Sequence, residues 1–195
     1  MEKSISSEDS VSSTAAPTGL IPVYHPSGTI RIDNQVDGVA SAYNTALYTG
    51  TPVKRTTDGT LVAVGTGADV CIGVFQGCQF TASTKRFVLP YFPASQTYDA
   101  GSMIAYFTSD PQIVYEGQAN ATIAATTIGE GINLANTSQG STYTGFSTQA
   151  LDATTTGSTD ATFQVLGLAP YPNNAWGDAY PVLRVKISTY QGQVA

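Results

Sequence analysis

Short patterns of alternating apolar and polar residues recur along this chain, and they restrict it to a β fold. The clearest is Val182–Ile187, whose three aliphatic side chains at alternate positions share one face while two basic side chains share the other. That is the period of a strand with one solvent-facing side. A helical period is hinted at only over residues 36–47, where Gly38 weakens it. We therefore predict an all-β fold, either an antiparallel β-sandwich or a small β-barrel.

Turn residues separate the other strand patterns. These patterns cover residues 60–64, 70–75, 87–92, 103–107, 112–116 and 162–168. The pair Asp58-Gly59 predicts a hairpin turn. Residues 87–92 are apolar on both faces, which predicts a covered strand, with Pro90 at an edge or bulge because proline cannot donate to a ladder. Two stretches rich in Ser, Thr and Gly, residues 136–145 and 152–160, predict exposed loops.

The N-terminal segment has a different character. Residues 1–18 are rich in Ser and Thr and hold too little apolar surface to order themselves. The apolar stretch that follows contains Pro22 and Pro26, which favour an extended backbone. We predict a partly disordered, extended N-terminal arm over residues 1–28 and a β-rich domain over residues 29–195.

The arm carries the first candidate contact residues, which are Leu20, Ile21, Val23 and Tyr24. An extended apolar segment can add to the edge of a neighbour's sheet, which gives backbone hydrogen bonds and side-chain pockets. Packing on its own domain is the alternative. If the arm docks on a neighbour, we expect a chain that begins at Thr29 to fold with unchanged stability but to bind its partner much more weakly.

An aromatic loop over residues 171–180 carries the other candidates. Tyr171 and Trp176 lie there among Pro, Asn and Gly residues. Aromatic residues in loops often anchor protein contacts. They could also fold down onto their own domain, and the sequence leaves both interpretations open.

Charge is scarce in this chain. Charged residues make up 11% of it, against about a quarter in ordinary globular proteins, and the net charge is −6. The eight basic residues form no run, so we do not expect a nucleic-acid partner. We also find no apolar run long enough for a membrane helix and no signal-peptide pattern at the N-terminus, so we expect a protein made in the cytoplasm and independent of membranes.

Residues for catalysis or metal binding are few. His25 is the only histidine, so a Ser–His–acid triad would have to use it, and its arm is a poor support for an oriented base. Cys71 and Cys78 are expected to be reduced, buried thiols. Paired acids could cleave glycosides, but sequence spacing in a β protein does not show which acids lie together; the candidates are Glu116, Glu130, Asp110 and Asp178. We expect no enzyme activity, no metal and no cofactor.

The stretch from residue 109 to residue 186 resembles a head structural protein of tailed phages. The pattern comprises DPQIVYE (residues 110–116), AATTIG (124–129), STYTGFS (141–147), VLGL (165–168), PNNA (172–175) and a final basic strand. The front half is similar to small phage decoration folds through GTPV (residues 50–53), DGT (58–60) and CIGVF (71–75).

The resemblance implies a decoration, or cement, protein on the exterior of a phage capsid. It implies that the chain is usually a homotrimer, that its partners are the major capsid protein and copies of itself, and that no catalytic residues carry over. The alternative is a tail or fibre protein that binds a glycan of the host surface, since Ser/Thr/Gly loops and exposed aromatic residues would also serve that purpose.

Overall fold

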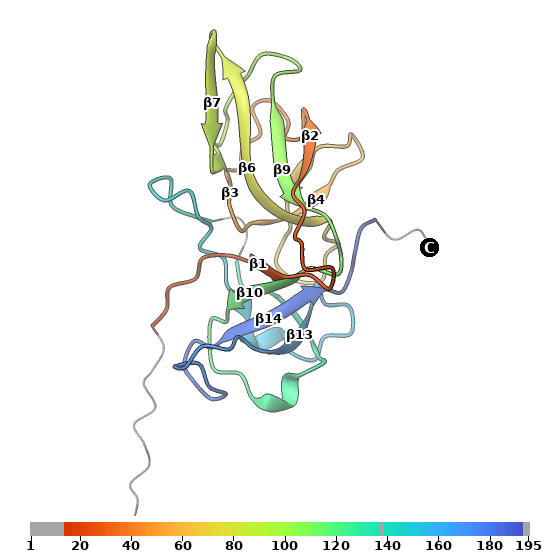
Figure 1. Ribbon diagram of the computed structural model, residues 1–195, viewed down its shortest axis with the longest axis vertical. Coiled ribbons are helices and arrows are strands. Elements are labelled where there is room, and N and C mark those ends of the chain that lie inside the picture. The colour runs from red at the N-terminus through yellow and green to blue at the C-terminus, as the bar shows by residue number, and fades with distance from the viewer. Residues whose placement is uncertain (1–13, 137–138, 193–195) are drawn as a thin grey trace, which may run out of the picture.

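The computed structural model describes residues 14–136 and 139–192, and its strands form two lobes, each around its own hydrophobic core (Figure 1). Every pairing between the named strands is antiparallel. This confirms the all-β, antiparallel class predicted from the alternating patterns. Residues 1–13 of the predicted arm lie outside the described residues.

A six-stranded sheet builds the lower lobe. In spatial order its strands are β1 (Ile21–Tyr24), β10 (Val114–Gln118), β14 (Val182–Ile187), β13 (Phe163–Leu168), β11 (Gly131–Leu134) and β12 (Leu151–Asp152). Two single turns of 3-10 helix, η1 (Ala125–Thr127) and η2 (Ala153–Thr155), lie in its connections. In β14 Leu183, Val185 and Ile187 are buried, whereas the two basic residues on the opposite face are not, as the alternation predicted.

The upper lobe contains the middle of the chain. Its main sheet has the order β2 (Asp33–Val36), β9 (Ile104–Thr108), β6 (Gly73–Ala82), β4 (Pro52–Arg55) and β5 (Leu61–Ala63), with β7 (Lys85–Leu89) paired to β6. A two-stranded sheet joins β3 (Leu47–Tyr48) to β8 (Tyr91–Phe92). The turn at Asp58-Gly59 connects β4 to β5, which confirms the predicted hairpin.

The prediction of a covered strand over residues 87–92 is wrong. Pro90 separates β7 from β8, and Val88 is 70% exposed. The physical reason is the position of β7, which among the described residues pairs with β6 alone and has four exposed residues out of five. The apolar residues on both faces of this segment therefore belong to an exposed edge strand and not to a buried one.

The predicted division between an arm and a domain at residue 28 is corrected by β1. Ile21–Tyr24 pairs with β10 as the edge strand of the lower sheet. The segment is anchored by the Leu20 N–H, which donates to the Gly50 carbonyl at 2.8 Å. Gly19 has a φ of +72°, and a Cβ there would lie 2.5 Å from the Gly50 oxygen, so this approach requires glycine.

The two thiols are free and lie in different cores. Cys71 belongs to the lower core and Cys78 to the upper one. Burial raises the pKa of each thiol to about 12, which keeps both protonated at neutral pH. The predicted absence of a bond between them agrees with this arrangement.

Adjacent residues of the N-terminal segment have opposite roles, which gives a first prediction. Leu20 is 2% exposed in the lower core, whereas Ile21 is 42% exposed. We expect Leu20→Ala to lower the free energy of unfolding by about 2–5 kcal/mol, because it leaves a cavity. The matched variant Ile21→Ala should change it by about 0.5 kcal/mol at most, as is usual for exposed positions. Chemical denaturation of both variants measures the difference.

Equal stability of the two variants would show that the segment is not docked on the lower core. The same reasoning corrects the expectation for a chain beginning at Thr29. Because that truncation removes both β1 and Leu20, we expect it to unfold more easily than the full chain.

Candidate functional site

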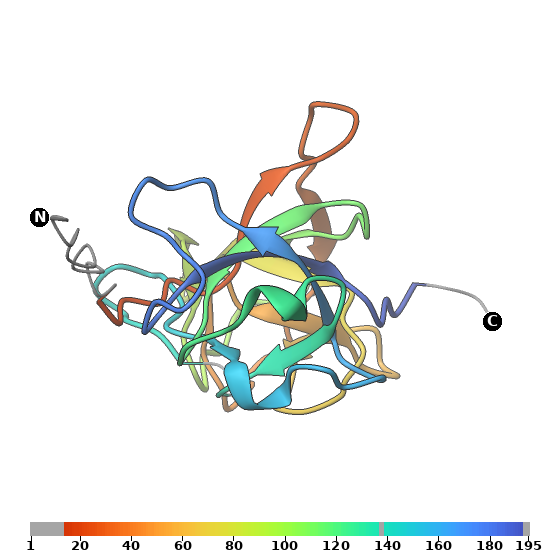
Figure 2. The same cartoon turned by 90° about the horizontal axis from the view of Figure 1, so that it is seen from below.

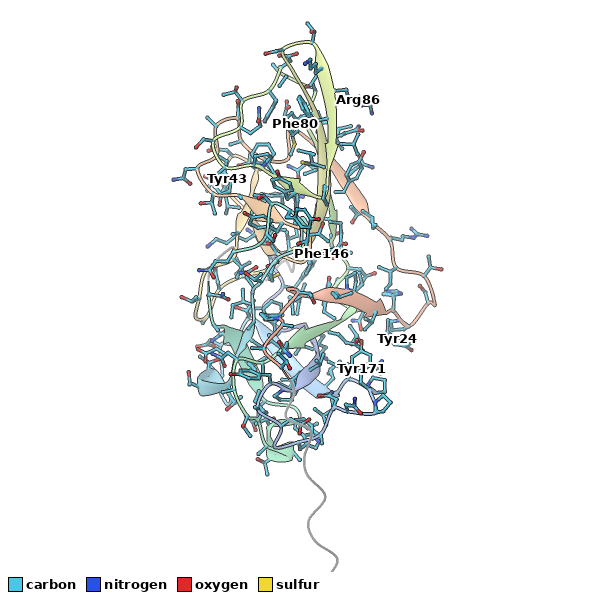
Figure 3. The ribbon with its side chains drawn as sticks, turned by 90° about the vertical axis from the view of Figure 1, so that its left-hand side faces the viewer. Tyr24, Tyr43, Phe80, Arg86, Phe146 and Tyr171 are labelled. Carbon is cyan, nitrogen blue, oxygen red and sulfur yellow. The ribbon has the colours of Figure 1, made fainter. Side chains whose placement is uncertain are left out.

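Three of the predicted contact residues line one groove. Ile21 and Val23 of β1 form one side of it and Tyr171 forms the other. Its volume is about 180 Å³, and its floor comes from β10 and from the start of β14. Tyr24 follows at the end of β1 and is 54% exposed. Figure 3 shows Tyr24 and Tyr171 on the same side of the lower lobe. We call this surface, formed by Ile21, Val23, Tyr24 and Tyr171, the β1 face.

The remaining two predicted contact residues are packing residues. Leu20 is buried over Gly117, where a Cβ would lie 2.5 Å from a Leu20 methyl carbon. Trp176 is half-buried and packs against the lower core. Both are corrected as candidates for contact, because each side chain turns inward from a segment that the sequence identified only as apolar or aromatic.

A buried carboxylate fixes Tyr171 beside β1. Glu116 of β10 lies opposite Arg184 of β14 in the sheet register, and the Arg184 Nε donates to Glu116 Oε1 at 3.1 Å. The Tyr171 hydroxyl donates to the other carboxylate oxygen. This hydrogen bond raises the pKa of Tyr171 above its usual value, and desolvation adds to the rise. Arg184 neutralises the carboxylate, so a buried charge is tolerated here.

The loop that carries Tyr171 is held by one asparagine. The Asn174 amide donates to the carbonyls of Ala169 and Val182 at 2.9 and 2.7 Å, and its oxygen accepts from the Val182 N–H at 2.9 Å. Asp178 accepts from the Ala175 N–H at 2.8 Å. In Figure 2 this loop and the loop between β1 and β2 project from the same side of the molecule. These hydrogen bonds therefore fix the loop that places Tyr171 in the β1 face.

A serine, the histidine and an acid meet just after β1. His25 Nδ1 lies 2.6 Å from Ser27 Oγ, and His25 Nε2 lies 3.0 Å from Asp110 Oδ2. The Ser27 N–H also donates to Nδ1, which makes Nδ1 an acceptor and places the ring proton on Nε2, toward Asp110. The sequence alone gave no sign that these residues lie together, because Asp110 is 85 positions from His25.

The two backbone N–H groups at and after Ser27 are not available for acyl transfer. An oxyanion hole requires free N–H groups aimed at the reacting oxygen. The Ser27 N–H donates to the His25 ring and the Gly28 N–H donates to the His25 carbonyl, so neither is free for this purpose. The arrangement therefore closes the turn after β1 and ties it to the segment before β10.

Sequence reasoning missed two exposed aromatic residues. Tyr143 is 96% exposed and Phe146 is also exposed, in the loop over residues 139–147. Figure 3 places Phe146 midway along the molecule, away from Tyr24 and Tyr171. The Ser/Thr/Gly composition correctly predicted an exposed loop, but it gave no signal of which aromatic side chains would point outward.

Comparison with known proteins adds no relative. No family model, no curated protein and no solved structure matches this chain. Within residues 14–136 and 139–192, no helix is long and apolar enough to cross a membrane. The described residues also contain no group of three or more His, Cys, Asp or Glu side chains suited to a metal ion.

The Tyr171–Glu116 contact gives a second prediction. The pKa of a tyrosine is about 10 in the unfolded chain. When folding raises that pKa, the tyrosine stabilises the fold at any pH below about 10, and this stabilisation is lost as the pH rises through the pKa of the folded state. Subtracting the absorbance titration of Tyr171→Phe from that of the unsubstituted protein isolates Tyr171. We expect this difference transition to lie above pH ~10 and to move down in the Glu116→Gln background. An unchanged midpoint in that background would contradict the assigned hydrogen bond.

Proposed function

We propose that this chain is a non-enzymatic structural protein of a tailed-phage particle, bound as a decoration protein to the outside of the capsid through its β1 face. The observation that carries the proposal is the open edge of the lower sheet. Within the described residues β1 pairs on one side only, and it presents Ile21 and Tyr24 to solvent beside Tyr171. Exposed apolar edges of this kind are typical of interaction surfaces.

The chemistry of β1 suits contact with another protein surface. Its sequence, IPVY, holds no charged residue, although edge strands are commonly protected by charges. Pro22 cannot donate a hydrogen bond, so an added strand would meet an interrupted ladder. We therefore expect the side chains of the β1 face, and not a continuous backbone ladder, to supply most of the contact.

Rigidity of the β1 face favours tight attachment. Because β1 is already paired and Tyr171 is held by Glu116, little conformational entropy is lost on docking. Burying each large apolar side chain contributes roughly 1.5–3 kcal/mol. A protein that binds only the assembled shell stabilises that shell by mass action. The resemblance further suggests the major capsid protein as the partner and a homotrimer as the bound form, and multiple attachment points would raise the avidity.

Substitution of the exposed residues tests this attachment. We expect Ile21→Ser and Tyr24→Ser each to weaken binding to purified undecorated heads by about 10- to 100-fold, because each removes a buried apolar anchor. Val88→Ser and Tyr143→Ser are the matched controls, since both residues are exposed and lie outside the β1 face. Co-sedimentation of each variant with the heads measures the binding.

Retained binding of both β1-face variants would contradict the proposal. Loss of binding in the controls instead would place the attachment surface on the loop over residues 139–147 or on β7.

The absence of hydrolase activity is the second part of the proposal. The N–H groups of Ser27 and Gly28 already bond His25, and Glu116 is engaged by Arg184 and Tyr171. We expect the purified protein to hydrolyse p-nitrophenyl acetate no faster than His25→Ala and to release no sugar from host glycans. Ester hydrolysis that disappears in Ser27→Ala, or glycan cleavage that disappears in Glu116→Gln, would show that the chain is an enzyme.

A further inference from the structure

The main sheet of the upper lobe has an inner and an outer face. On β9, Ala105 and Phe107 belong to the upper core, whereas Ile104 and Tyr106 alternate with them and are only half-buried. Because the side chains of a strand point alternately to opposite faces, Ile104 and Tyr106 lie on the outer face. Figure 1 shows β7, β6, β9 and β2 side by side, so this outer face is four strands wide.

One row of side chains crosses all four strands on the outer face. Ile104 pairs with Val36 of β2 and with Gln79 of β6. Gln79 in turn pairs with Val88 of β7. Three of the four residues in the row are aliphatic, and Val36 is 58% exposed and Val88 70% exposed. We call the surface formed by Val36, Gln79, Val88, Ile104 and Tyr106 the upper face.

An apolar outward row is unusual for a sheet that faces water. Antiparallel sheets with one solvated face normally carry polar residues on that face. The lower sheet follows this rule in β14, where Arg184 and Lys186 point outward. Contiguous apolar residues on an exposed surface mark a site of contact with another molecule. We therefore expect a partner to cover the upper face.

The two sides of the upper face carry opposite charges. On β7, Arg86 Nη2 donates to Gln79 Oε1 at 2.5 Å, which places the guanidinium on this face. Asp37 directly follows β2; its N–H donates to the Met103 carbonyl and its carboxylate accepts from the Gly101 N–H. In the strand register Arg86 and Asp37 lie toward the same end of the sheet, and Figure 3 shows Arg86 near the upper end of the molecule. Among the described residues, neither forms an ion pair.

These charges favour a second copy of the chain as the partner, in one orientation. A two-fold axis parallel to the strands places β7 of one copy over β2 of the other. Arg86 then faces the partner's Asp37, and Val88 faces the partner's Val36. A two-fold axis across the strands would place β2 over β2 and would leave both charges without partners. A different protein with a surface of one sign would be repelled on one side of the upper face.

We propose that two copies of this chain pack through their upper faces, with the two-fold axis parallel to the strands. The aliphatic rows cover each other at the centre, and the two pairs of Arg86 with Asp37 lie at the sides. This contact goes beyond attachment to a shell and does not depend on it, because the upper face and the β1 face share no residue. It is also distinct from the three-fold association that the resemblance suggests for the bound form.

Chemical crosslinking of the full-length protein tests which residues meet. We expect the double variant Val36→Cys/Val88→Cys, treated with a short bismaleimide, to give covalent dimers on a denaturing gel. A mixture of the two single variants should give them as well, whereas each single variant alone should not. Within one copy the two positions are three strand spacings apart, about 14 Å, and a link within the chain would leave it at the size of a monomer.

The two native cysteines do not interfere with this experiment. Cys71 and Cys78 are buried, and burial raises the pKa of each thiol to about 12. Because the thiolate is the reactive form, neither reacts readily with the crosslinker at neutral pH.

Sedimentation equilibrium measures the strength of the contact. We expect the free protein to form dimers, and Val36→Ser to raise the dissociation constant of the dimer by about tenfold or more, because each dimer covers two copies of Val36. Arg86→Glu should also weaken the dimer, since it places two carboxylates opposite each other. Ile128→Ser is the matched control, because Ile128 is an aliphatic residue of similar exposure in the lower lobe.

Four results overturn the proposal. They are a free protein that stays monomeric at submillimolar concentration, a trimer as its oligomer in solution, covalent dimers formed as readily by Val36→Cys alone, and equal dissociation constants for Val36→Ser and Ile128→Ser. Thermal unfolding at a dilution where every variant is monomeric should give matching curves, which shows that a weakened dimer reflects the upper face and not the fold.

Discussion

The close backbone contact between Gly19 and Gly50 determines where the N-terminal segment lies. It brings the Leu20 N–H to the Gly50 carbonyl, which lies in a turn of the upper lobe. Leu20 then enters the lower core, and the following residues alternate outward along β1. The groove beside Tyr171, the exposure of Tyr24 and the turn closed by His25 all follow from this one approach.

Edge strands and low charge together explain the surface that we propose for attachment. A protein with only 11% charged residues has few long-range electrostatic forces to orient it, so the proposed docking would depend on shape and apolar contact. The β1 face supplies both. Its Tyr171 is held by a hydrogen bond to Glu116, and the loop that carries Tyr171 is held by the Asn174 amide.

Local features were predictable from the sequence, whereas the long-range pairing was not. Alternation located Val182–Ile187, and Asp58-Gly59 located the hairpin between β4 and β5, because each depends on neighbouring residues alone. The pairing of β1 with β10 joins segments about 90 positions apart, and no local pattern encodes it. For the same reason composition identified Leu20 and Ile21 as one apolar cluster, although one is buried and the other exposed.

An electron cryomicroscopy reconstruction of particles that carry this protein tests the central claim most directly. The account predicts density for both lobes on the outer surface of the shell, in many symmetry-related copies. It also predicts that Ile21, Tyr24 and Tyr171 contact the capsid subunits. Density confined to the tail, or copies on the shell whose β1 face points to solvent, would contradict it.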